Sequence, residues 1–206
     1  MQKKLTVTVM AIAVIAALLF TASTGVAAAQ QNKTQVQLGS PRTRDINRME
    51  VLQEEVRHQL VMLPYYSVFD WLQAQVKPDG TVVLMGEVTR PTLKSDAEDR
   101  VEKLEGATRV INDIEALPLS PMDDELRVAL YRAIFRFNGP LFRYGTQSVP
   151  PIHIIVKNGR VALKGIVLNQ MDSQLAEFAA RSVPGSFEVK NELQIEQQLD
   201  EKVSRR

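Results

Sequence analysis

Two stretches of the chain alternate strictly between apolar and polar positions after a turn signal. Residues 77–88 read KPDGTVVLMGEV, and residues 157–167 read KNGRVALKGIV. Asp-Gly and Asn-Gly pairs supply the positive φ angles of a two-residue type I′ turn, so each stretch is predicted to form a tight β-hairpin. Gly86 and Gly165 interrupt the two hairpins at the same point. A glycine inside a strand usually lets another backbone or helix approach closely.

The two hairpins belong to a longer internal repeat. From Gly80 onward the two copies align without a gap at a spacing of 79 residues. The recurring residues are Gly80, Val82, Leu84, Gly86, Val88, Ala97, Glu98, Gly106, Val110 and Asn112, matched by Gly159, Val161, Leu163, Gly165, Val167, Ala176, Glu177, Gly185, Val189 and Asn191. Two copies are too few for a solenoid, so two small domains in tandem are predicted.

Helical and strand periodicities surround both hairpins in the same order. In the first copy they predict a helix from Asp45 that stops at Pro64, a strand over 65–76, the hairpin, a helix from Pro91 that ends at Gly106, and a strand over 109–117. In the second copy they predict a helix from Met122 to about Phe137, strands over 152–156 and 160–168, a helix over 170–182 and a strand over 187–195. The predicted fold class is α+β. It comprises two tandem α-β-β-α-β modules, each a three-stranded mixed sheet packed by two helices.

The start of the chain has the layout of a secretory signal. Lys3 and Lys4 precede an apolar run from Leu5 to Phe20, and three alanines end at Ala29. The run is short for a membrane span, which needs about 20 residues, so cleavage after Ala29 is favoured over an uncleaved anchor. In either case the modules are expected outside the cytoplasm, in the periplasm. The predicted segments are a signal peptide (1–29), a disordered lead-in (30–44), the first module (45–118), the second module (119–196) and a charged tail (197–206).

Composition excludes several classes of function. The 206 residues include no cysteine, which rules out disulfides, thiolate chemistry, cysteine-rich zinc sites and lipid attachment through an N-terminal cysteine. The formal net charge of +1 argues against nucleic acid as the main partner. Modules of about 75 residues lie near the lower size limit for an independent core, so packing of one module on the other is plausible.

Candidate chemistry is sparse. His58 and His153 fall in different modules, and a zinc site needs several convergent ligands, so solvated or structurally satisfied histidines are expected. Residues 123–125, Asp-Asp-Glu, stand at a predicted helix start, where carboxylates complement the helix dipole. The sequence therefore predicts no catalytic residue, no metal site, no cofactor and no small-molecule substrate. A hydrolase is kept as the third hypothesis.

The most unusual stretch is residues 127–144, RVALYRAIFRFNGPLFRY. A helical wheel predicts a core-facing stripe of Leu126, Leu130, Ala133 and Phe137, which leaves aromatic and arginine side chains on the other face. Aromatic rings flanked by guanidinium groups suit a bilayer interface, where the rings lie at headgroup depth. The candidate lipid- or partner-binding residues are Arg127, Val128, Tyr131, Arg132, Phe135, Arg136, Phe142, Arg143 and Tyr144.

Two interpretations of this face stay open: it covers the first module, or it contacts lipid. The equivalent helix of the first module has glutamates at positions 50, 54 and 55, so any surface binding is expected in the second module. Leu175 and Phe178 on the later helix could extend the same apolar surface. Replacement of Tyr131 and Phe135 by serine is expected to remove the surface activity and leave the fold intact.

The repeated pattern Gly-x-Val-x-Leu-x-Gly-x-Val, followed by an alanine-containing helix and Gly-x-x-x-Val-x-Asn-x-Ile/Leu, resembles the BON domain of bacterial osmotically inducible and nodulation proteins. The two copies of the pattern span Gly80 to Ile114 and Gly159 to Leu193. The resemblance implies exported envelope proteins with paired α-β-β-α-β modules that associate with phospholipid surfaces or support envelope integrity under stress. It transfers a fold and no site, because the motif residues are turn glycines, core valines and an asparagine that ties the last strand to a neighbour.

The sequence thus favours a non-enzymatic, exported protein that binds an anionic phospholipid membrane surface or envelope proteins. The alternative is a periplasmic chaperone or protein–protein scaffold that uses the same exposed aromatic and basic groups.

Overall fold

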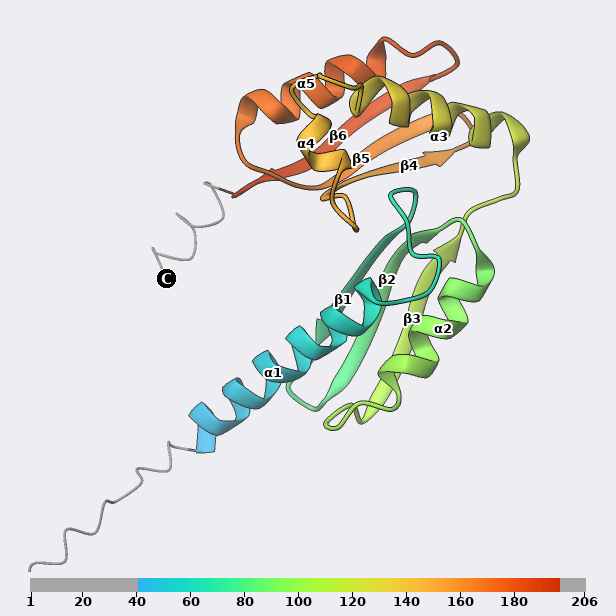
Figure 1. Ribbon diagram of the computed structural model, residues 1–206. Coiled ribbons are helices and arrows are strands. Elements are labelled where there is room, and N and C mark those ends of the chain that lie inside the picture. Colours follow the sequence, from blue (N-terminus) through green and yellow to red (C-terminus); the bar gives the residue numbers. More distant parts are fainter. Residues whose placement is uncertain (1–40, 197–206) are drawn as a thin grey trace, which may run out of the picture. The chain divides into compact units, whose positions relative to one another are not determined.

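The structure, a computed structural model, describes residues 41–196 (Figure 1). The predictions made for the signal peptide (1–29), for residues 30–40 of the lead-in and for the tail (197–206) lie outside the described residues.

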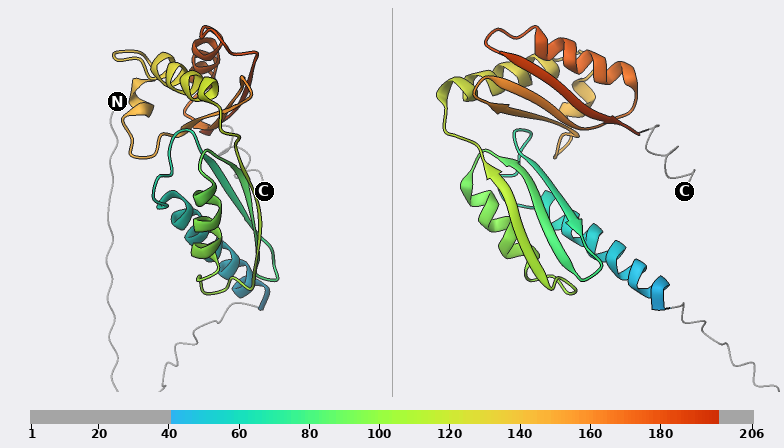
Figure 2. Two further views of the ribbon diagram at one scale, coloured as in Figure 1. Left: turned by 90° about the vertical axis from the view of Figure 1, so that its right-hand side faces the viewer. Right: turned by 180° about the vertical axis from the view of Figure 1, so that it is seen from behind.

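The first module is an α-β-β-α-β unit, as predicted. Its elements are α1 (Pro41–Val61), β1 (Trp71–Val76), β2 (Thr81–Val88), α2 (Pro91–Val101) and β3 (Arg109–Ala116). Strand β2 is central, antiparallel to β1 and parallel to β3, which makes the sheet mixed. Helices α1 and α2 cover one face of this sheet (Figures 1 and 2). Their apolar stripes bury Leu52, Val56 and Leu60 from α1 and Leu93, Ala97 and Val101 from α2.

The second module repeats this architecture with one addition. Its elements are α3 (Pro121–Ile134), α4 (Phe142–Gly145), β4 (Ile152–Lys157), β5 (Arg160–Val167), α5 (Gln170–Arg181) and β6 (Glu188–Ile195). The order β4-β5-β6 and the antiparallel-then-parallel pairing match the first sheet. The short helix α4 lies where the sequence predicted a loop, and it has no counterpart in the first module. The predicted α+β fold of two tandem modules is confirmed.

The two hairpin turns differ, and the prediction is correct for only one. In the second hairpin Lys157 pairs directly with Arg160, and Asn158 and Gly159 both have positive φ (52° and 74°), as a two-residue type I′ turn requires. In the first hairpin a three-residue loop connects the strands.

The loop of the first hairpin is longer because a proline stands in it. Lys77 N–H donates to the Thr81 carbonyl (2.8 Å), and Gly80 N–H donates to the Lys77 carbonyl (3.0 Å). Only Gly80 has a positive φ (78°), which is the pattern of a type I turn followed by a left-handed glycine. Pro78 fixes its own φ near −65°, which suits the second position of a type I turn.

The strand glycines allow close backbone approach, as predicted. Gly165 has a φ of 121°, and a Cβ there would lie 1.9 Å from the carbonyl oxygen of Pro151. Gly86 repeats the arrangement with a φ of 132° and the same separation from the Trp71 carbonyl. In both modules the backbone at the start of the first strand therefore occupies the space of the missing side chain.

The repeated asparagine ties the last strand to the preceding helix in both modules. Asn191 Nδ2 donates to the Ser173 carbonyl (3.1 Å) and to the Glu177 carboxylate (3.1 Å). Asn112 Nδ2 makes the equivalent bonds to the Lys94 carbonyl and Glu98 (2.9 Å each). The repeat of Glu and Asn seen in the sequence is thus one structural unit.

Several predicted boundaries are wrong. Helix α2, predicted to end at Gly106, ends at Val101, and three further differences have identifiable reasons. Helix α1 begins at Pro41 rather than Asp45, so the last four residues of the predicted lead-in are helical; proline is favoured in the first turn, where its missing N–H is not needed. Residues 65–70 form a loop rather than part of a strand, and Tyr65 has a φ of 68°. Helix α3 ends at Ile134, about three residues earlier than the wheel assumed.

Replacement of Gly165 by alanine is expected to destabilise the second module more than replacement of Gly185. Both glycines have positive φ, but no heavy atom lies within 4 Å of the place that a Cβ would take at Gly185, so Gly185→Ala carries only backbone strain, about 1–2 kcal/mol. Gly165→Ala adds a clash with the Pro151 carbonyl, and we expect a loss of at least about 4 kcal/mol. Urea unfolding of both variants measures the difference, and equal midpoints would contradict the proposed close approach.

Candidate functional site

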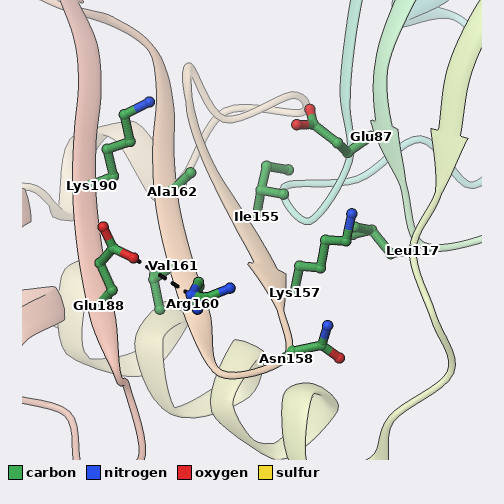
Figure 3. A pocket seen from close by; sticks show the side chains of 10 residues that line it. All are labelled: Glu87, Leu117, Ile155, Lys157, Asn158, Arg160, Val161, Ala162, Glu188 and Lys190. Atoms are coloured by element: carbon green, nitrogen blue, oxygen red, sulfur yellow. Dashed lines mark ion pairs between the residues drawn. The ribbon is translucent and has the colours of Figure 1, made fainter.

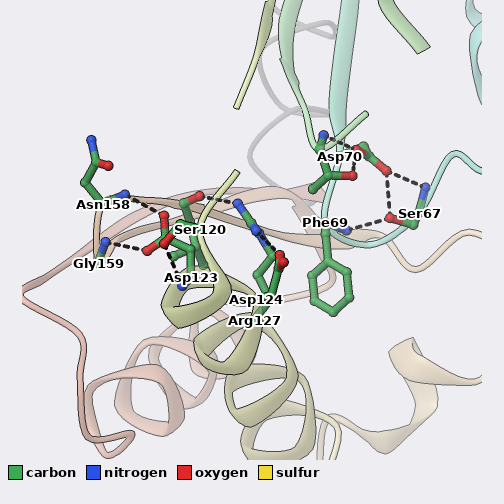
Figure 4. Close-up of polar contacts among 11 residues, drawn as sticks. Ser67, Phe69, Asp70, Ser120, Asp123, Asp124, Arg127, Asn158 and Gly159 are labelled. Carbon is green, nitrogen blue, oxygen red and sulfur yellow. Dashed lines mark hydrogen bonds and ion pairs between the residues drawn. The ribbon is translucent and has the colours of Figure 1, made fainter. Parts of the chain in front are cut away.

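Helix α3, which contains most of the candidate residues, is fixed at its start by hydrogen bonds. The Ser120 hydroxyl accepts from the Asp123 N–H (3.2 Å), an N-terminal cap. The buried Asp123 carboxylate accepts from the N–H groups of Asn158 and Gly159 (2.8 Å each) in the β4–β5 turn (Figure 4). This acidic residue therefore joins a helix start to a hairpin turn, a structural role.

The loop of residues 65–70 belongs to the first module and contacts the second. The buried Asp70 carboxylate holds it by accepting from the N–H and hydroxyl of both Ser67 and Thr89, at 2.6–3.0 Å (Figure 4). The Val68 carbonyl then accepts from the Ile154 N–H of β4 (2.8 Å), and Val68 is buried in the core of the second module. Phe69 packs against the same core, with its ring 6.3 Å from that of Tyr131.

The inner candidate residues are buried or half-buried. Phe135 is only 6% exposed, and its ring lies 5.0 Å from the half-buried Tyr131. Arg127 and Tyr144 are 4% exposed each. These three side chains do not form an open face, and the burial of Phe135 argues against the expectation that serine at positions 131 and 135 leaves the fold intact. The interpretation that this face covers the first module holds for Tyr131, which Phe69 contacts.

Phe137, predicted to be in the core, is 73% exposed. The helical wheel placed Phe137 in the core and Phe135 on the outer face, the reverse of the structure. Because α3 ends at Ile134, the 3.6-residue period applies to neither position. Phe135 instead turns back into the core, and Asn138, with a φ of 57°, reverses the chain. The buried stripe of the helix is Leu126, Leu130 and Ile134.

The outer candidate residues remain at the surface. Val128, Arg132, Arg136 and Arg143 are exposed, and Phe142 is half-buried. The Phe137 and Phe142 rings meet edge to face at 5.3 Å between centroids. We name Arg132, Arg136, Phe137, Phe142 and Arg143 the aromatic-basic patch. Within residues 41–196 neither Arg132 nor Arg136 forms an ion pair, so their charge is available to a partner.

Arg143 is oriented by a polar cluster beneath the patch. Its guanidinium pairs with the buried Asp172 carboxylate and lies 5.0 Å from the centre of the Tyr144 ring. The Tyr144 hydroxyl donates to Asp172 (2.7 Å) and accepts from the Leu168 N–H (3.0 Å). Hydrogen bonding to Tyr144 and the charge of Asp172 raise the pKa of Arg143. This residue is thus held in place as well as charged.

The neighbouring helix α5 carries a further apolar stripe. Met171 and Phe178 are exposed, at 69% and 75%, and Leu175 between them packs partly against the core. Spacings of four and three residues place the three on one helical face. Helices α3 and α5 contact each other on the same side of the sheet (Figures 1 and 2). Phe178 is therefore exposed, in agreement with the prediction from the sequence.

The sheet face opposite the helices has a pocket of about 300 Å³ with many charged side chains (Figure 3). Its cations are paired with carboxylates: Lys157 with Glu115, Arg160 with Glu188 and Lys190 with Glu192. Its further carboxylate, Glu87, is paired with Lys164 outside the pocket. Two of these pairs, Lys157–Glu115 and Lys164–Glu87, join the modules. Because the charges are balanced, this pocket contributes to docking of the modules rather than to ion binding.

The two histidines have different environments. His58 is exposed on α1, whereas His153 on β4 is buried with its ring 5.1 Å from that of Trp71 and 5.6 Å from that of Tyr66. Its Nδ1 has no hydrogen-bond partner among the described residues. Burial lowers the pKa of His153, and backbone groups of Asp70 and Ser67 oppose this only in part. The imidazole is thus a neutral component of the module junction.

The sequence model of one protein family, described as "BON domain", matches residues 50–118 and 142–197, which together exceed half of the chain. No curated protein matches the chain. Two solved structures, both of CdsD, a structural protein of the type III secretion system of Chlamydia trachomatis, are 15% identical to it. The match to the C-terminal domain structure covers 74% of this chain and 68% of that one with a TM-score of 0.29; the other covers 76% and 98% with a TM-score of 0.27.

Single alanine variants of Phe135 and Phe137 should differ in stability, because one ring lies in the core and the other at the surface. Phe135→Ala removes a buried ring and is expected to lower the free energy of unfolding by about 3–5 kcal/mol. Phe137→Ala changes an exposed ring, and its effect should stay within about 0.5 kcal/mol. Chemical denaturation of the two variants tests the assignment. If Phe137→Ala is the less stable variant, Phe137 belongs to the core, as the helical wheel predicted.

The stability of the protein is expected to depend on His153 below neutral pH. Above about pH 6.5 the imidazole is neutral in both the folded and the unfolded chain, so it adds no pH dependence. As the pH falls below 6.5 the unfolded chain takes up a proton that the buried ring resists, and stability falls by up to about 1.4 kcal/mol per pH unit. Thermal unfolding between pH 7.5 and 5 should show a smaller loss for His153→Phe than for the wild type. The control His58→Gln alters an exposed imidazole and should lose as much stability as the wild type. If His153→Phe loses equally much, protonation of His153 does not determine the pH dependence.

Proposed function

The chain belongs to the BON domain family, and on that premise we propose that it is an exported, non-enzymatic protein of the cell envelope whose second module binds anionic phospholipid surfaces. The proposal that it is exported rests on the signal-like start of the sequence. None of the helices among residues 41–196 combines the length and the apolar character that a bilayer span requires. Contact through a surface is therefore the mode of membrane association that we propose.

The observation that supports lipid binding is the aromatic-basic patch. The exposed Phe137 ring packs edge to face on the half-buried Phe142, and burial of an exposed ring contributes about 1.5–3 kcal/mol. Arg132 and Arg136 flank the rings with unpaired charge, and a guanidinium binds phosphate oxygens through paired hydrogen bonds. Each arginine near an anionic leaflet adds about 1 kcal/mol.

The position of the patch supports its accessibility. The patch lies at the end of α3 and in the following segment up to α4, whereas α3 is engaged with the β4–β5 turn at its start and with the first module at Tyr131. The exposed Met171 and Phe178 of α5 extend the apolar surface. Binding would thus require no separation of the modules.

A periplasmic chaperone or scaffold is the second candidate function. The same exposed rings could bind an apolar segment of a client protein, because exposed apolar surface is characteristic of protein and membrane contact sites alike. The arginines favour lipid, since a client held only by apolar contact would not require them.

Binding to vesicles should depend on the exposed Phe137 and the half-buried Phe142. We expect the wild type to float with vesicles of phosphatidylglycerol and phosphatidylethanolamine and not with pure phosphatidylcholine. The double variant Phe137→Ser/Phe142→Ser should bind the anionic vesicles at least about tenfold more weakly, because it loses two insertable rings. Binding should also weaken as salt is raised, since exposed charges are screened over about 10 Å at 0.1 M.

Phe187→Ser is the matched control, because Phe187 is an equally exposed ring outside the patch. It should float like the wild type, and circular dichroism of all variants should match. If the wild type does not float but suppresses aggregation of an unfolded client, and the double variant loses this suppression, the chaperone function replaces the lipid function.

A further inference from the structure

Strand β6 lies at an edge of the second sheet. The sheet order β4-β5-β6 pairs it with β5 alone, and within residues 41–196 no other backbone segment hydrogen-bonds to it (Figure 2). A strand with one neighbour directs alternate N–H and C=O groups away from its sheet, where another strand can pair with them. The Val189 carbonyl accepts a long bond (3.4 Å) from Arg181, whose side chain is exposed and can move aside. The eight residues of β6 are therefore open to strand addition.

The opposite edge of each sheet is covered in part by groups of the same chain. On β4, the Ile154 N–H donates to the Val68 carbonyl. On β1, the side-chain amide of Gln53 acts like a neighbouring peptide group: it donates to the Ala74 carbonyl (2.9 Å) and accepts from the Val76 N–H (3.1 Å). Unpaired strand edges are sites of association unless something covers them. This leaves β3 and β6 as the edges at which a second chain could pair.

The side chains of β6 divide between the two faces of the sheet. Glu188 and Lys190 lie on the open face (Figure 3), and Glu192 follows them by the two-residue period of a strand. Val189 lies in the core, and Leu193 packs against it from the same face. Charges on an edge strand usually prevent edge-to-edge pairing, because like charges meet across the new ladder. Whether they do so here depends on the register of the pair.

The charges favour one register for a symmetric antiparallel pair of β6 with β6 of a second copy. Such a pair is centred on a single residue, and centring it on Asn191 or Glu192 gives the longest overlap. The register centred on Glu192 sets the two Glu192 carboxylates opposite each other, which is unfavourable. The register centred on Asn191 sets Lys190 of each copy opposite Glu192 of the other. Lys190 already pairs with Glu192 within the chain (2.5 Å), so the four groups would alternate in sign.

The same register matches the remaining positions of the strand. Val189 lies opposite Leu193 of the second copy on the helical face, and Glu188 lies opposite the uncharged Gln194. Cross-strand pairs of opposite charges and pairs of apolar side chains each stabilise an antiparallel ladder. The alternation of β6 is therefore self-complementary about Asn191.

Strand β3 is less suited to such a pair. Centred on Asn112, it would set the Asp113 carboxylate opposite Ile111 of the second copy. Its Glu115 is engaged by Lys157 of the second module. The edge with complementary positions is thus that of β6.

We propose that the protein forms a symmetric dimer in which β6 pairs with β6 of a second copy, antiparallel and centred on Asn191. Opposite residues of an antiparallel pair share a face, so the two sheets join into one of six strands with the helices of both copies on the same side. Pairing of two short strands buries less than about 1,200 Å² in total, so the dimer is transient. The interface is separate from the aromatic-basic patch, and its formation requires no lipid.

Charge reversal on β6 tests the dimer. Sedimentation equilibrium of the purified protein, from about 1 µM to about 1 mM, should show a reversible monomer–dimer equilibrium. Lys190→Glu sets like charges opposite each other twice, and so does Glu192→Lys. Each variant should dimerise at least about tenfold more weakly, because two cross-strand attractions become repulsions. Lys103→Glu makes the same change of charge as Lys190→Glu at an exposed site in the first module, and should associate like the wild type. A wild type that stays monomeric over this range would refute the proposal.

A mixture of the two charge variants tests the contact itself. In a heterodimer of Lys190→Glu with Glu192→Lys, every contact between positions 190 and 192 again joins opposite charges. The mixture should therefore associate about as tightly as the wild type, and the double variant Lys190→Glu/Glu192→Lys should recover as well. Circular dichroism of all variants should match, because both positions are exposed. A mixture no tighter than its components would mean that the dimer contact lies elsewhere, and the assignment to β6 would be rejected.

Introduced cysteines report the register directly, since the chain contains none. Opposite Cα atoms of an antiparallel pair are about 4.5–5.5 Å apart, within reach of a disulfide, whereas diagonal positions are about 7–8 Å apart. An oxidised mixture of Lys190→Cys with Glu192→Cys should therefore yield mixed disulfide dimers in clear excess over either variant alone. Equal yields would overturn the register centred on Asn191. Phe137→Ser/Phe142→Ser should leave dimerisation unchanged, so failure here is separable from failure of the membrane proposal.

Discussion

The structure depends on the saturated, fully buried carboxylate of Asp70. A buried carboxylate is tolerated only when hydrogen bonds replace its hydration, and here four donors from Ser67 and Thr89 do so. The bonds from Ser67 hold residues 65–70 in the loop that contacts the second module. The other side fixes Thr89 at the exit of β2, directly before the start of α2. The contact of this loop with the second module thus depends on the hydrogen bonds of one carboxylate.

At the equivalent position in the second module, a tyrosine hydroxyl replaces the carboxylate as the hydrogen-bond acceptor. Leu168 is the repeat partner of Thr89, and its N–H donates to the Tyr144 hydroxyl rather than to a carboxylate. Tyr144 reaches that position because the inserted helix α4 brings it over the strand exit, and its hydroxyl in turn donates to Asp172. The insertion that makes this bond also places Phe142 and Arg143 at the surface. Divergence of the repeat and the origin of the aromatic-basic patch are therefore one structural event.

Sequence periodicity predicts structural features that depend on residues close in sequence. It fails where contacts with a distant segment determine the local structure. The hairpins, the glycine contacts of Gly86 and Gly165 and the Asn191–Glu177 tie follow from local pattern, so they were predictable. Alternation also suggested a strand at 65–70, but Asp70 takes its partners from Thr89, 19 residues away, and forms a loop. The exchange of Phe135 and Phe137 arose from an assumed helix length. The bond of the Val68 carbonyl with the Ile154 N–H joins segments of two modules, and no local pattern indicates it.

Helix α3 explains why binding is proposed beyond its end rather than along it. Its first turn holds the β4–β5 turn through Asp123, its second holds the β4 carbonyl of Val156 through Arg127, and Tyr131 in its third turn contacts Phe69 of the first module. A helix restrained on three sides cannot move to meet a partner without loss of these contacts. The segment from Arg136 to Arg143 is held instead by Leu141, which is buried in the core of its own module, and by the pair of Arg143 with Asp172. Its exposed rings therefore combine accessibility with a fixed position, which is the condition for binding without a large ordering penalty.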